Sequence, residues 1–159
     1  MAERAPSGGG EYGIAVTRVF EAPRAHVWRE WTEPDRFADW FGGRQAEIPL
    51  STVSMDVRPG GEWRATMFAG PERREIRWKG EYREVVEPER LVFTVTDQPE
   101  EPAYELVTVV LAELDDQRTE MRFEQRGHMR PEEYERAEAG WGTFFDRIAE
   151  RLAEAGPSG

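Results

Sequence analysis

Cysteine is absent from the 159-residue chain, and only two histidines are present, His26 and His128. Without a thiol, the protein can form no disulfide, no thiolate nucleophile and no cysteine-ligated metal site. The two histidines are separated by roughly a hundred residues and fit no zinc-ligand spacing. We therefore expect no bound metal.

Long apolar runs are also lacking. No segment approaches the roughly 20 apolar residues that span a bilayer, and the first residues, MAERAPSGGGEYG, lack the apolar stretch of a signal peptide. The sequence thus predicts a cytoplasmic protein without membrane insertion.

Positive charge is scarce. The 21 Lys and Arg residues face 32 Asp and Glu residues, which leaves a formal net charge of −11. An acidic surface repels phosphate backbones, so we expect no nucleic-acid partner. The glycine-rich loops that bind nucleotide phosphates and the serine motif of hydrolases are also missing, and no cofactor is expected.

Aromatic residues, in contrast, are plentiful: they make up 11% of the chain and include six tryptophans. A chain of this length forms one domain and buries about 70% of its unfolded surface. We expect a single domain over residues 12–155, with flexible tails at 1–11 and 156–159.

The pattern of apolar residues predicts two short helices within a mostly β chain. Residues 12–20 are rich in β-formers, and Pro23 and Pro34 each stand where a helix begins. Further strands are predicted by two-residue alternation or by turn signals, at the ranges 46–57 (one broken or two short strands), 62–67, 75–82, 91–97, 104–114 and 119–126.

The last segment is a long helix that begins at Pro131 and ends before Gly156. Its apolar residues recur at three- and four-residue steps. Gly140 and Gly142 lie inside it, where each costs about 1 kcal/mol relative to alanine. This cost indicates close backbone approach to a sheet, a bend, or space kept for a ligand.

This order of elements predicts an α+β fold. Strands outnumber helices and are joined mostly by tight turns, which favours an antiparallel sheet over βαβ units. A curved sheet of six or seven strands would wrap around the long C-terminal helix and bury its aromatic face.

Four blocks of the sequence resemble one known family. They are FEAPRAHVWREWTEPDRFADWFGG, DVRPGGEWRATM, GEYREVVEPERLVFT and GHMRPEEYERAEAGWGTFFDRIAERL. In order and spacing they resemble the AHSA-type family, bacterial relatives of the activator of the heat-shock-protein-90 ATPase. That family belongs to the START and birch-pollen-allergen-like superfamily, also called SRPBCC.

The resemblance implies a helix-grip fold with an apolar cavity between the sheet and the last helix. It does not imply one activity, because relatives include lipid and polyketide binders, polyketide cyclases and aromatases, and resistance proteins. The eukaryotic activator carries a partner-binding domain upstream of its START-like part. We expect no such domain here, so a chaperone role gains little from the resemblance.

The candidate ligand-binding residues all fall on inward faces by strand alternation or helical spacing. They are Trp63, Met67, Trp78, Tyr82, Phe93, Met121, Phe123, Trp141 and Phe145. The same set would also form an ordinary hydrophobic core, and large side chains such as Trp63 could fill the cavity. Gln125 shares the inward face and needs a hydrogen-bond partner there.

Three functions follow as hypotheses. The first is a binding protein, monomeric or dimeric, for a small apolar or aromatic ligand. The second is an enzyme of the cyclase or aromatase type, for which Tyr82 and His128 are the candidate acid or base residues. The third is a stress-response or chaperone-accessory protein, which would need an exposed apolar patch at Trp40 and Phe41.

Overall fold

A computed structural model describes residues 13–155. The predicted tails, 1–11 and 156–159, and Tyr12 lie outside these described residues. The helices are α1 (Arg24–Thr32), α2 (Pro34–Trp40) and α3 (Pro131–Ala155), with short 3-10 turns at Gly43–Gln45 and Leu50–Thr52. The strands are β1 (Gly13–Phe20), β2 (Ala46–Glu47), β3 (Ser54–Met55), β4 (Glu62–Ala69), β5 (Arg74–Val86), β6 (Arg90–Val95), β7 (Glu105–Asp115) and β8 (Arg118–Arg126).

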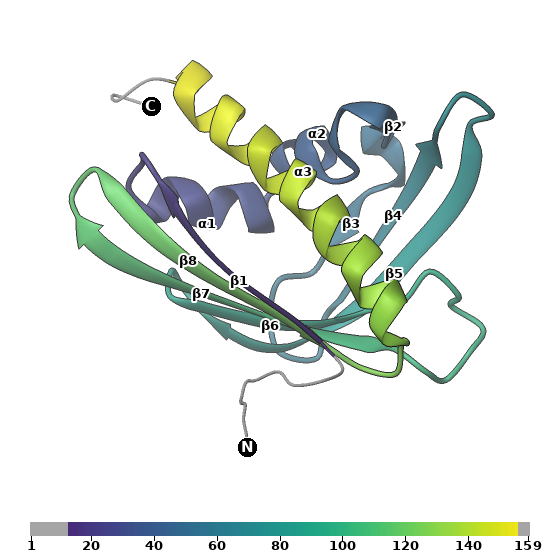
Figure 1. Cartoon of the computed structure of the whole chain (residues 1–159). Helices are drawn as coiled ribbons and strands as arrows, with labels where there is room; N and C mark the ends of the chain where they lie inside the picture. The colour runs from purple at the N-terminus through teal and green to yellow at the C-terminus, as the bar shows by residue number, and fades with distance from the viewer. Residues whose placement is uncertain (1–12, 156–159) are drawn as a thin grey trace.

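The strands form one curved antiparallel sheet of eight strands in the order β1-β8-β7-β6-β5-β4-β2, with β3 also paired to β4 (Figure 1). The sequence predicted six or seven strands. The difference lies in β2 and β3, which have two residues each and pair with opposite ends of β4. Both lie within the range 46–57, where the sequence predicted one broken or two short strands.

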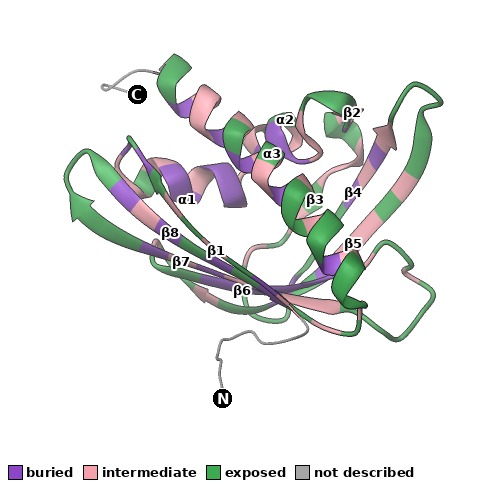
Figure 2. Cartoon of the chain, viewed as in Figure 1, coloured by how far each residue is buried: buried purple, intermediate pink, exposed green. Residues whose placement is uncertain are grey.

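Alternation along the strands decides which side chains face the helices. In β4, Trp63, Ala65 and Met67 are buried while Glu62 and Arg64 are exposed. The concave face therefore collects apolar side chains, and the convex face carries charged ones. Figure 2 shows this division along the sheet.

Helix α3 crosses the concave face of the sheet (Figure 1). It begins at Pro131 as predicted, and its buried residues include Trp141, Phe145 and Ile148. An added Cβ at Gly140 or Gly142 would meet no heavy atom within 4 Å. Close backbone approach, one of the three explanations offered for these glycines, is therefore wrong.

Trp31 of α1 fills the centre of the concave face. Its ring lies 4.8 Å from that of Trp40 and 6.2–6.3 Å from those of Phe123, Trp141 and Phe145, centroid to centroid. Trp40 and Phe41 are 0% and 3% exposed. These two residues therefore form no exposed apolar patch.

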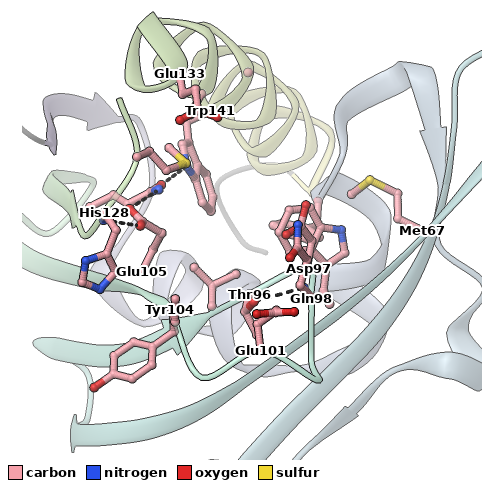
Figure 3. A pocket seen from close by; sticks show the side chains of 18 of the residues that line it. Met67, Thr96, Asp97, Gln98, Glu101, Tyr104, Glu105, His128, Glu133 and Trp141 are labelled. Carbon is pink, nitrogen blue, oxygen red and sulfur yellow. Dashed lines mark hydrogen bonds between the residues drawn. The ribbon is translucent and has the colours of Figure 1, made fainter. Parts of the chain in front are cut away.

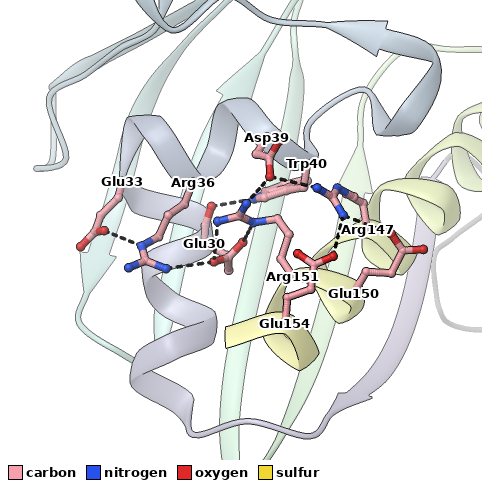
Figure 4. Close-up of polar contacts among 9 residues, drawn as sticks. All are labelled: Glu30, Glu33, Arg36, Asp39, Trp40, Arg147, Glu150, Arg151 and Glu154. Carbon is pink, nitrogen blue, oxygen red and sulfur yellow. Dashed lines mark hydrogen bonds and ion pairs between the residues drawn. The ribbon is translucent and has the colours of Figure 1, made fainter. Parts of the chain in front are cut away.

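An ion-pair cluster around the buried Glu30 holds the C-terminal half of α3 against α1 and α2 (Figure 4). Glu30, only 2% exposed, accepts a hydrogen bond from Arg151 Nε at 2.7 Å. Arg151 also pairs with Asp39, and Arg36 Nη1 lies 3.5 Å from Glu30 Oε2. The N-terminal half of α3 contributes nothing to this cluster.

No helix among the described residues is both long and apolar enough to cross a bilayer.

Candidate functional site

A cavity of about 450 Å³ lies between the N-terminal half of α3 and the sheet (Figure 3). The connection between β6 and β7, residues 96–104, forms part of its wall. The lining residues are Phe41, Met67, Trp78, Val95, Thr96, Asp97, Gln98, Glu101, Ala103, Tyr104, Glu105, Gln125, His128, Met129, Glu133, Ala137, Gly140, Trp141 and Phe144.

The walls of the cavity are mostly aromatic and aliphatic. Met67 and Trp78 come from β4 and β5, Trp141 and Phe144 come from α3, and Phe41 follows α2. The aromatic rings touch one another: Phe41 lies 5.6 Å from Trp78 and 5.5 Å from Phe144, centroid to centroid. Such rings provide broad apolar surface for a ligand.

A chain of hydrogen bonds ties α3 to β8 and β7 at the edge of the cavity. Trp141 Nε1 donates to Gln125 Oε1 at 2.8 Å, and Gln125 Nε2 donates to Glu105 Oε1 at 3.1 Å. Tyr134 Oη donates to the same Glu105 oxygen at 2.8 Å. Gln125 is 4% exposed and is satisfied through both ends of its amide. The chain fixes the Trp141 ring at the cavity wall.

Gly127 makes room for the Glu105 carboxylate. A Cβ at residue 127 would lie 1.9 Å from Glu105 Oε2, closer than any real contact. That oxygen accepts a hydrogen bond from the His128 backbone nitrogen at 2.8 Å. The turn between β8 and α3 is thereby held against the start of β7, with His128 exposed at the cavity edge (Figure 3).

Tyr134 keeps its proton. It is 3% exposed, and burial, followed by its hydrogen bond to the Glu105 carboxylate, raises the pKa of the phenol well above its ordinary value of 10. The neutral hydroxyl is the form that donates to Glu105, so geometry and ionisation agree.

Among residues 13–155, no three His, Asp or Glu side chains are grouped closely enough to hold a metal ion. Trp78 lines the cavity, and its indole Nε1 is buried without an acceptor among the described residues.

The model of the family "Activator of Hsp90 ATPase homolog 1-like protein" (AHSA1) matches residues 21–153. The chain belongs to this family. Comparison with curated proteins found no match.

Solved structures share the AHSA1 fold. A protein from Nitrosomonas europaea is 26% identical with a TM-score of 0.78, over 92% of this chain and 97% of the other. One from Chromobacterium violaceum is 23% identical with a TM-score of 0.77, over 89% and 97%. The AHSA1 protein of Silicibacter pomeroyi is 19% identical with a TM-score of 0.78, over 90% and 99%.

The sequence-predicted residues divide between the cavity and the solid part of this AHSA1 domain. Met67, Trp78, Trp141 and His128 line the cavity. Met121, Phe123 and Phe145, each at most 1% exposed, lie in the hydrophobic core and not at the cavity.

Trp63, Tyr82 and Phe93 surround only a void of about 10 Å³ beside Trp31. Tyr82 is 2% exposed, and burial together with the charge of Asp56 raises the pKa of its phenol. The structure therefore brings His128 to the cavity but not Tyr82.

Several residues at the AHSA1 cavity were not among the sequence candidates. Glu105 is the main one, and Asp97, Gln98 and Glu101 of the β6–β7 connection are others. Glu133 lies in the first turn of α3 and accepts a hydrogen bond from the Arg130 backbone nitrogen at 2.8 Å. The inward placement of Gln125 was the one available signal, because a buried amide required polar neighbours.

Proposed function

We propose that this protein binds a small apolar or aromatic molecule in the cavity beneath the N-terminal half of α3, without chemical conversion. One observation supports the proposal above all others: a cavity of about 450 Å³ with walls of Trp78, Trp141, Phe41 and Phe144. Ligand pockets usually measure about 300–1,000 Å³ and have apolar walls with a few polar groups.

The packing elsewhere in the molecule adds support. Trp31 and its neighbours fill the other part of the concave face, where the remaining void is about 10 Å³. The same aromatic residue types that fill the region around Trp31 surround the cavity without filling it. The family has a ligand-binding fold, which agrees with the proposal but specifies no ligand.

A second hollow of about 600 Å³ lies between α1 and the β5–β6 turn. Its lining includes the charged residues Arg29, Glu33 and Glu87, and Trp28 is its only aromatic residue. It lacks the continuous aromatic wall of the α3 cavity, so we assign ligand binding to the cavity.

The proposal is tested by a thermal-shift panel of fatty acids, sterols, flavonoids and polyketide-like phenols. A ligand at a hundred times its dissociation constant adds about 2.7 kcal/mol, or about 5–11 °C in melting temperature for a domain of this size. We expect a rise confined to one chemical class.

Two glycine variants make the test specific to the cavity. Gly140 lines the cavity and Gly142 does not, although a Cβ at either position meets open space. Gly140→Leu should remove the ligand-induced rise, whereas Gly142→Leu should retain it. A rise that survives Gly140→Leu contradicts binding in this cavity, and a flat panel contradicts the proposal itself.

An enzyme of the cyclase or aromatase type is the second candidate, favoured by the position of His128 at the cavity edge. An imidazole can act as acid or base near neutral pH. Mass spectrometry of compounds recovered from the panel separates the two candidates. Unchanged compounds support a binding protein, and a product that His128→Ala abolishes supports the enzyme.

A further inference from the structure

The ionised side chains that line the cavity are all acidic. Four carboxylates line it: Asp97 and Glu101 from the β6–β7 connection, Glu105 from β7 and Glu133 from α3. No Arg or Lys is among the lining residues. Figure 3 shows the labelled carboxylates distributed around the cavity and drawn from both the sheet side and α3.

Among residues 13–155, three of these carboxylates have no ion-pair partner. Glu133 lies 3.5 Å from Arg130, but Asp97, Glu101 and Glu105 pair with no Arg, Lys or His among residues 13–155. Glu105 accepts its hydrogen bonds from an amide, a phenol and a backbone nitrogen, all of them neutral.

On the convex face of the sheet, several carboxylates form ion pairs with arginines. There the carboxylates alternate with arginines and pair with them, as in Arg90–Glu84 at 3.0 Å and Arg122–Glu120 at 3.1 Å. The chain has arginines in quantity, but none between residues 13 and 155 lines the cavity. Carboxylates without an ion pair also occur elsewhere, as the net charge of −11 requires, but the cavity lining combines them with an absence of Arg and Lys among the described residues.

This charge selects among apolar ligands. Carboxylates beside a low-dielectric wall attract a cation and repel an anion, and the net charge of −11 adds to the effect. No three His, Asp or Glu side chains among the described residues are grouped closely enough to hold a metal ion, whereas an organic ammonium group can pair with a single carboxylate.

We propose that the preferred ligand is a protonated amine on an apolar or aromatic body. The ammonium group pairs with one of the carboxylates at the cavity, Asp97, Glu101 or Glu105, and the body packs against Trp78 and Trp141. This inference rests on the proposed function, because it names the ligand class of the same cavity.

Three probes with one indole body test the inference: tryptamine is a cation near neutral pH, tryptophol is neutral and indole-3-propionate is an anion. Decylamine, decanol and decanoate form a second series with an alkyl body. Titrations at pH 7.5 and low salt are followed through the indole N–H signals of Trp78 and Trp141 by NMR. We expect each amine to bind at least about tenfold more tightly than its carboxylate, with the alcohol between. Salt should reduce the difference.

A pair of double variants tests whether the carboxylates at the cavity cause the preference. Asp97→Asn with Glu101→Gln should weaken tryptamine binding about 2- to 10-fold and leave tryptophol binding unchanged. Glu72→Gln with Glu100→Gln removes the same charge from exposed residues outside the cavity lining and should leave both unchanged.

The outcomes separate the inference from the proposed function. Equal binding of amine, alcohol and carboxylate, or tighter binding of the carboxylate, overturns the amine preference and leaves ligand binding in the cavity intact. Equal weakening of tryptamine by both double variants also overturns it, because the effect then comes from net charge alone. If neither series perturbs Trp78 or Trp141, the proposed function fails and the inference fails with it.

Discussion

At the residue scale, Glu105 connects more of the site than any other side chain. Its carboxylate joins β7 to β8 through Gln125, to α3 through Tyr134 and to the preceding turn through the His128 backbone. Gly127 is required for this position, because a Cβ there would overlap the carboxylate. The cavity edge thus depends on one charged residue whose surroundings are all neutral donors.

Tyr134 gives this arrangement a measurable pH dependence. Its pKa in the folded protein is raised above the unfolded value of about 10, first by burial and then by Glu105. The stability from its neutral hydroxyl is therefore fully present below pH 10 and is lost as the pH rises through the folded value. We expect the free energy of unfolding to decrease above about pH 10, by at most about 1.4 kcal/mol per pH unit for this proton.

Urea unfolding between pH 8 and pH 11 checks the expectation. Tyr134→Phe should lose about 1.5–3 kcal/mol at pH 8, because its hydrogen bond to a carboxylate is removed, and should then decline less steeply than the wild type. Tyr82→Phe is the comparison, since the pKa of Tyr82 is also raised but by burial and Asp56. Parallel curves for wild type and Tyr134→Phe would contradict the assignment.

Of the two hydrogen-bonded residues Gln125 and Glu105 at the cavity edge, only Gln125 was predictable from the sequence. Strand alternation places Gln125 inward, and a buried amide at that position needs a hydrogen-bond partner. Glu105 opens β7 directly after a long connection, where alternation assigns no face with certainty. Its contacts depend on how that connection and the turn at Gly127 fold back, which is a tertiary property.

At the element scale, α3 has two halves with different roles. The C-terminal half is fixed to α1 and α2 through Glu30, Asp39 and Arg151 (Figure 4). The N-terminal half covers the cavity and carries Gly140 at its wall. The C-terminal half holds the helix against the rest of the domain, and the N-terminal half forms one wall of the cavity.

Removal of Arg151 should show how strongly the C-terminal half is fixed. In Arg151→Met, the buried Glu30 keeps only Arg36, at 3.5 Å, as a charged partner. We expect a loss of about 3 kcal/mol in the free energy of unfolding, because one partner of a buried pair is removed.

Arg44→Met is the matched control. Arg44 pairs with Glu150 at the exposed surface of the same helix, and a surface pair contributes less than about 1 kcal/mol. Chemical denaturation of the two variants measures the difference. Equal losses of unfolding free energy in the two variants would contradict the claim that the buried position of Glu30 makes its ion pair more stabilising than a surface pair.

Most elements were predictable from the sequence, since proline positions and two-residue alternation are local signals. The start of α3 at Pro131 and the buried set Trp63, Ala65 and Met67 follow directly from such signals. The range 46–57 was predicted to hold one broken or two short strands, but the bounds of β2 and β3 and their pairing with β4 depend on tertiary contacts.

At the scale of the whole molecule, the helix-grip arrangement separates a solid region from a hollow one. The sequence predicted that nine aromatic and methionine side chains face inward, but it contained no information on which of them would pack together. Trp31 decides this, because its ring occupies the centre of the concave face and contacts Trp40, Phe123 and Phe145. Met67, Trp78 and Trp141 lie at the cavity beyond it.

The central claim, that an apolar ligand binds beneath the N-terminal half of α3, is tested most directly by the indole N–H signals of the six tryptophans in a ligand titration. Trp78 and Trp141 line the cavity, Trp28 lines the second hollow, and Trp63 lies in the solid region. The account predicts saturable shifts at Trp78 and Trp141, with smaller changes at Trp28 and Trp63. Shifts centred on Trp28, or no shifts at Trp78 and Trp141 with any compound that raises the melting temperature, would contradict it.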